Sequence, residues 1–156
     1  MAVTTAGRVR TAPGVAVLAA LLLVLLFGNP AYVDWQSRHA GNDAWGFILK
    51  TLAWPSWSFS STQPLQTVLA NDIKAILLIV FTGIFVAALV GARGALSGFF
   101  AGWGGYIFAA ALAGFLAAFI QVNASLLGAF GWASLGAVYG LFVGWIVGLA
   151  TLAARA

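Results

Sequence analysis

The residues best suited to chemistry lie in one short stretch, which contains Asp34, Arg38, His39 and Asp43. A histidine close to carboxylates can act as an acid and base, or it can hold a metal ion. The spacing matches no known pattern of metal ligands, and exposed residues of a loop explain it better. We therefore expect no catalytic residue, no metal site and no bound cofactor in this chain.

Other kinds of site lack the residue types that they need. The chain has no cysteine, which excludes disulfides, thiolate-bound zinc, iron–sulfur ligation and cysteine nucleophiles. His39 is the only histidine, so this chain alone cannot supply a bis-histidine haem. The sequence has no HExxH motif, no nucleophile elbow and no phosphate-binding loop between a strand and a helix. These observations favour a protein that is not an enzyme.

The composition indicates a membrane protein. Charged residues make up 6% of the chain and hydrophobic residues 63%, and so apolar a chain cannot cover a soluble core with polar surface. The seven basic residues are scattered singly and form no basic stripe, which argues against nucleic acid as a partner. We expect a single all-α domain over residues 1–156, a polytopic integral membrane protein.

Four apolar segments predict four transmembrane helices, at about 12–28, 73–91, 97–120 and 126–152. The first is the shortest, and it also resembles a signal peptide because Arg8 and Arg10 precede its apolar core. Pro30 stands just before the obvious cleavage point, so we interpret the segment as a retained span. None of the four carries an ionisable residue at its centre, where coupled transport would place one. Asp72 and Lys74 lie at the outer end of the second segment, where snorkelling of the lysine explains its charge.

The distribution of charge predicts that both termini are cytoplasmic. With the N-terminus inside, the cytoplasmic segments hold four basic residues and no acidic one: Arg8, Arg10, Arg93 and Arg155. The outer segments then hold three basic and three acidic residues: Arg38, Lys50, Lys74, Asp34, Asp43 and Asp72. An excess of Lys and Arg marks the cytoplasmic side. The alanine-rich and glycine-rich composition without glutamate favours the plasma membrane of a bacterium, its inner membrane.

The outer loop, at about 29–72, is rich in tryptophan. It holds four of the seven tryptophans: Trp35, Trp45, Trp54 and Trp57. Within it, Asn42 or Asp43 can cap a short helix with an apolar face that ends before Pro55. Because tryptophan favours the membrane interface, we expect this helix to lie flat on the outer leaflet or against a partner. Pro64 is suited to the start of a further helix, which would extend the second span outward.

Small residues recur every four positions in the last two spans. The fourth span carries one row, which consists of Gly136, Gly140, Gly144 and Gly148. The third span carries two rows, one led by Gly94, Gly98 and Gly102, the other by Ala101, Gly105 and Ala109. Such rows let helices approach closely in lipid. The two spans pack on each other in one interpretation, and in a second, compatible one a spare row faces another subunit.

The leading functional hypothesis is a non-catalytic accessory or scaffold subunit of a larger membrane complex. It would dock through the small-residue faces and the tryptophan-rich loop, with other integral membrane subunits and membrane lipids as its partners. An alternative is a pore or facilitator for a small neutral solute, built from several copies that pack through the glycine row. A weaker alternative is an interfacial enzyme that acts on a lipid, with Asp34, His39 and Asp43 as candidate groups.

Overall fold

The chain is built from helices alone throughout the residues that the structure describes. The structure is a computed structural model, and it describes residues 11–59, 62–90, 95–121 and 123–155. Six helices follow one another in this part of the chain: α2 (Ala12–Phe27), α3 (Pro30–His39), α4 (Ala44–Leu52), α5 (Leu65–Leu89), α6 (Ala95–Ala118) and α7 (Leu126–Arg155). The all-α class predicted from the sequence is therefore confirmed.

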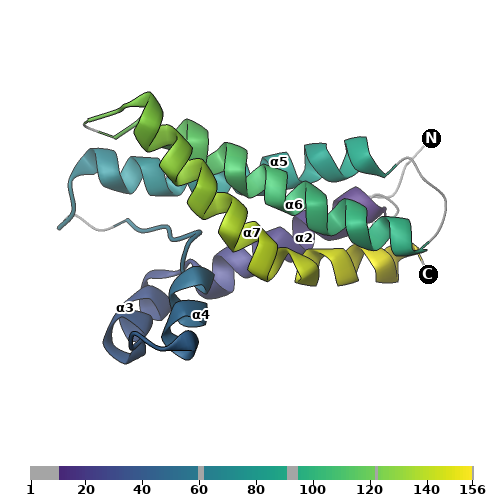
Figure 1. The fold of residues 1–156 in the computed structure, drawn as a ribbon, viewed down its shortest axis with the longest axis horizontal. Coiled ribbons are helices and arrows are strands. Elements are labelled where there is room, and N and C mark those ends of the chain that lie inside the picture. The colour runs from purple at the N-terminus through teal and green to yellow at the C-terminus, as the bar shows by residue number, and fades with distance from the viewer. Residues whose placement is uncertain (1–10, 60–61, 91–94, 122, 156) are drawn as a thin grey trace.

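Four of these helices form a bundle, and the two short ones form an arm at one end of it (Figure 1). Helix α6 packs against α5 on one side and α7 on the other, and α2 packs against both α5 and α7. The start of α2 and the end of α7 lie at one end of the bundle, and α3 and α4 lie at the opposite end (Figure 1). We call the end that carries α3 and α4 the arm end.

Three helices, α5, α6 and α7, are long and apolar enough to cross a membrane, which agrees with the membrane protein predicted from the composition. They lie where the second, third and fourth spans were predicted, except that α5 begins at Leu65 and includes the predicted outward extension. Helix α2 coincides with the first predicted span, but its 16 residues are fewer than the roughly 20 that a span needs. It reaches that length only together with α3, at a bend of 58°. The first span, and with it the count of four, therefore stays a prediction.

Asn29 ends α2 and begins α3. Its side-chain amide donates to the carbonyls of Leu25 at 3.0 Å and Leu26 at 2.7 Å, and its side-chain oxygen accepts from the amide of Tyr32 at 2.9 Å. Pro30 occupies the first turn of α3, where its missing N–H costs nothing. Helix α3 was not predicted, although the pair Asn29-Pro30 is a typical helix start. The predicted outer loop over 29–72 therefore contains two complete helices and the first two turns of α5.

Helix α4 is the short helix that was predicted in the tryptophan-rich loop. Asp43 caps it, since its carboxylate accepts from the amide of Gly46 at 2.8 Å. Lys50 in the last turn donates to the carbonyl of Gly41 at 3.1 Å, which ties the end of the helix to the loop before it. Leu49 is buried, whereas Ile48 remains 45% exposed.

The glycine row of α7 faces α6. A Cβ atom on any of its four glycines would run into one residue of α6, in the order Ala110, Ile107, Trp103 and Phe99. At Gly140 the Cβ would lie 2.6 Å from Ile107 Cα, which is a backbone atom and cannot rotate away. Helices in lipid associate largely through close packing, and a row of glycines permits this approach.

Both rows of α6 are also occupied inside the chain at the described positions. A Cβ on Gly98 or Gly102 would meet Thr151 of α7, and one on Gly105 would lie 2.9 Å from Val86 Cγ2 of α5. Ala101 and Ala109, the other members of the second row, are buried. Gly94 lies outside the described residues. The interpretation that one row is spare for another subunit is therefore wrong for these positions.

We expect Gly140→Ala to lower the stability of the protein by about 1–3 kcal/mol, because the added methyl group forces two backbones apart. Gly104 is the matched control, since it lies in the middle of α6 and a Cβ there would have no atom within 4 Å. Gly104→Ala should leave stability unchanged or raise it by up to about 1 kcal/mol, because alanine favours helix more than glycine does. Thermal unfolding in mild detergent measures both, and equal melting temperatures for the two variants would contradict the packing.

Candidate functional site

Lys74 is buried at the arm end of the bundle rather than extended toward water. Its side chain is 5% exposed, and its ammonium lies 4.8 Å from the centre of the Trp54 ring and 5.4 Å from that of Trp132. It donates one hydrogen bond, to the side-chain oxygen of Asn71 at 3.1 Å. The explanation of Lys74 by snorkelling is therefore wrong. We call Lys74, Trp54, Trp132 and Asn71 the lysine cage.

The cage holds a positive charge without an acidic partner among the residues that the structure describes, where the one ion pair is between Arg38 and Asp34. The face of an aromatic ring attracts a cation, and the attraction exceeds about 2 kcal/mol when water is excluded. Two indole rings therefore stabilise the buried ammonium in place of a carboxylate.

Trp54 reaches the cage because two glycines leave room for its ring. A Cβ on Gly114 of α6 would lie 3.3 Å from Trp54 Cζ2, and one on Gly136 of α7 would lie 3.0 Å from the same atom. The ring also stacks on Tyr139, with centres 4.9 Å apart and planes at 22°. Trp54 follows α4 in the sequence, so this contact inserts the end of the arm between α6 and α7.

Two buried tyrosines continue the polar contacts inward from the cage. The hydroxyl groups of Tyr106 on α6 and Tyr139 on α7 lie 2.7 Å apart, and both side chains are fully buried. A second hydrogen bond joins the same helices at the opposite end, where Thr151 donates to the carbonyl of Gly98 at 2.7 Å. Each bond satisfies a hydroxyl group that hydrocarbon would otherwise leave without a partner.

Trp57 holds the end of α2. Its ring N–H donates to the carbonyl of Val24 at 3.1 Å, and its backbone amide donates to the carbonyl of Gly28 at 2.9 Å. Trp54 and Trp57 therefore make their contacts within the chain itself. Trp35 is 45% exposed and Trp45 is 62% exposed, so these two remain available to the leaflet or a partner.

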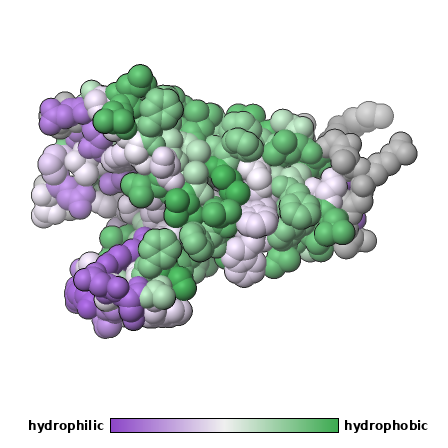
Figure 2. All heavy atoms as spheres, in the orientation of Figure 1, coloured by the Kyte–Doolittle hydropathy of each residue, from purple (hydrophilic) through white to green (hydrophobic). Residues whose placement is uncertain are grey.

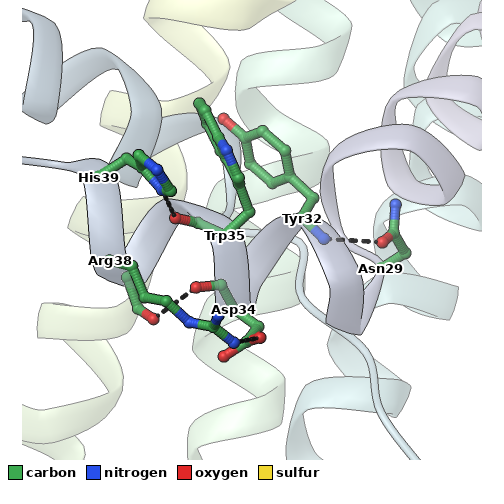
Figure 3. Close-up of polar contacts among 7 residues, drawn as sticks. Asn29, Tyr32, Asp34, Trp35, Arg38 and His39 are labelled. Atoms are coloured by element: carbon green, nitrogen blue, oxygen red, sulfur yellow. Dashed lines mark hydrogen bonds and ion pairs between the residues drawn. The ribbon is translucent and has the colours of Figure 1, made fainter.

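The acidic and basic residues of the arm do not converge on one point. Asp34 pairs with Arg38 one turn later, the His39 ring nitrogen Nδ1 lies 2.8 Å from the carbonyl oxygen of Trp35, and its ring stacks on the Trp35 ring (Figure 3). Asp43 caps α4. In the described part of the chain no three His, Cys, Asp or Glu residues come together in a way that could hold a metal ion.

No protein-family model, no curated protein and no solved structure matches this chain.

The sequence offered one signal for the cage. Asn71 and Lys74 are three positions apart, so in a helix they lie on the same face one turn apart. Nothing in the spacing pointed to Trp54 or Trp132, because these residues meet Lys74 only through the packing of distant segments.

The cage predicts different reactivity for the two lysines of the chain. An amine-reactive reagent that does not cross membranes should modify Lys50, which is exposed, and leave Lys74 unmodified. Trp54→Ala removes one aromatic wall and should make Lys74 reactive, whereas Trp45→Ala removes an exposed ring on α4 and should not. Peptide mass mapping after labelling of the intact protein measures this, and modification of Lys74 in the parent protein at the rate of Lys50 would refute the cage.

Proposed function

We propose that the protein is a non-catalytic accessory or scaffold subunit of a larger membrane complex, with both termini in the cytoplasm. The observation that carries this proposal is an apolar groove of about 360 Å³ between α4 of the arm and α7 of the bundle. The groove is lined by nine residues, of which only Thr51 is polar: Phe27, Phe47, Ile48, Thr51, Leu52, Phe142, Val143, Trp145 and Ile146. We call it the α4–α7 groove.

The chemistry of the α4–α7 groove suits an apolar helix of another integral membrane subunit. Phe142 and Trp145 are 53% and 47% exposed, and Phe47 packs edge-on against Phe142 at 5.5 Å. Large aromatic side chains of this kind are enriched in the cores of protein interfaces. The contact of Phe47 with Phe142 and the stacking of Trp54 on Tyr139 hold α4 against the bundle, so the groove is formed before any partner binds.

The alternative of a pore formed by several copies has less support. It assigned the glycine row of α7 to contacts between copies, and that row faces α6 of the same chain. Within the bundle, large side chains such as Tyr106, Tyr139 and Leu78 fill the space between the described helices. A scaffold that binds through its outer surface agrees better with an interior packed in this way.

If a partner binds in the α4–α7 groove, a substitution in the groove should weaken that binding. Ile48→Ala should reduce the amount of unlike protein chains that co-purify in mild detergent by about tenfold, the effect of about 1.4 kcal/mol at an interface residue. Ile84→Ala is the matched control, because Ile84 on α5 is similarly exposed, at 55% against 45%, and lines no groove described here. Native mass determination gives the result, and a particle that contains only copies of this chain would favour the pore instead.

The orientation is tested separately. Arg155 lies at the end of α7, opposite the arm that carries Lys50, and the excess of basic residues favours the cytoplasm for the end without the arm (Figure 1). A cysteine introduced at Arg93 should react with an impermeant thiol reagent only from the cytoplasmic side, and a cysteine at Lys50 only from outside. The reverse pattern in sealed vesicles of known sidedness would overturn the proposed orientation.

A further inference from the structure

The arm end contains a polar hollow of about 390 Å³ between α3, the segment after α4 and the start of α5. Six of its ten lining residues carry a polar side chain other than an indole: Asp34, Ser37, Ser56, Ser58, Gln63 and Asn71. Hydrophilic residues gather at this end of the molecule, whereas the bundle surface is mostly hydrophobic (Figure 2). The hollow therefore lies where a membrane protein meets the head-group region.

An apolar groove of about 380 Å³ runs between α2 and α5. Six of its nine lining residues are aliphatic, and three of the nine are open to the surroundings, since Leu25 is 48%, Ile76 59% and Phe59 88% exposed. From Asp72 to Ile79 the groove follows α5 for about 10 Å. These helices face hydrocarbon in a membrane, so the groove has the surroundings and the dimensions of a site for part of an acyl chain.

The polar hollow and the α2–α5 groove meet at Trp57, which lines both. Asp72 lies at the same junction, where its carboxylate accepts from the amide of Ser58 at 2.9 Å. The two hollows together form one site with a polar part at the arm end and an apolar part along the bundle. A lipid has this division, with a polar head group joined to apolar chains.

The charges of the site distinguish between kinds of head group. Among the described residues that line the two hollows there are two carboxylates, Asp34 and Asp72, and no lysine or arginine. Arg38 pairs with Asp34, whereas Asp72 pairs with no cation in the described part of the chain. A head group with an ammonium offsets this negative charge, and an anionic head group adds to it.

We propose that this site binds a phospholipid with an amine-bearing head group, such as phosphatidylethanolamine. One acyl chain lies in the α2–α5 groove, and the head group occupies the polar hollow with its ammonium attracted to Asp72. The hydroxyl group of Ser56 and the side-chain amides of Gln63 and Asn71 supply hydrogen-bond donors for the ester and phosphate oxygens. The site is separate from the α4–α7 groove and does not depend on the partner proposed there.

The test uses the full-length protein in nanodiscs that contain equal amounts of phosphatidylethanolamine and phosphatidylglycerol. After release into mild detergent, native mass spectrometry should show one retained phosphatidylethanolamine, preferred about fivefold over phosphatidylglycerol, which is the effect of roughly 1 kcal/mol from a partly exposed charge pair. Asp72→Asn keeps an oxygen for the Ser58 amide and removes the charge, so it should abolish most of this preference.

Asp43→Asn is the matched control for the loss of one negative charge. Asp43 lines neither hollow, and asparagine also caps helices well, so this variant should keep the preference. The preference of the parent protein is informative even if Asp72→Asn folds poorly, because it needs no variant. Equal retention of the two lipids by the parent, retention of neither, or equal effects of Asp72→Asn and Asp43→Asn would each overturn the proposal.

Discussion

The close approach of α6 and α7 is the contact on which the rest of the structure depends. Lipid tails are as apolar as leucine, so two helices in a membrane gain little from removing apolar surface from their surroundings. They gain from dispersion, which fades steeply with small gaps. The position of Gly140 against the Ile107 backbone removes such a gap at the centre of the pair. Helix α5 then packs on the free side of α6, and α2 closes the bundle between α5 and α7.

Glycines of α6 and α7 also make room for the arm to pack against the bundle. Gly114 and Gly136 leave a slot between α6 and α7, and Trp54 fills it from outside. Its ring then covers the ammonium of Lys74, whose side chain is buried. A buried charge is costly when its partner is missing, so the lysine favours the arrangement in which the arm is docked. Packing and electrostatics therefore stabilise the same position of the arm.

A docked arm gives the molecule two unlike surfaces at one end. On one side of α2 the α4–α7 groove is almost wholly apolar and aromatic. On the other side the α2–α5 groove runs into a polar hollow that carries carboxylates. Trp57 lies where this hollow and the α2–α5 groove meet, and its hydrogen bond to Val24 secures the end of α2. A scaffold subunit that holds a lipid on one side and a neighbouring protein on the other would use both surfaces.

The sequence by itself determined the helical class, the membrane environment, the places of the three long helices and the short helix capped by Asp43. These follow from composition, from runs of apolar residues and from local hydrogen bonds within a few residues, all of which are visible along the chain. It also held the signal for α3, in Asn29 and Pro30. Only the tertiary structure decided which small-residue row faces which helix. A row of glycines in the sequence indicates a helix contact, but it does not show which helix makes that contact. The lysine cage likewise exists only after folding, since Lys74 gains its walls from Trp54 and Trp132, which come from distant segments that the helix packing brings together.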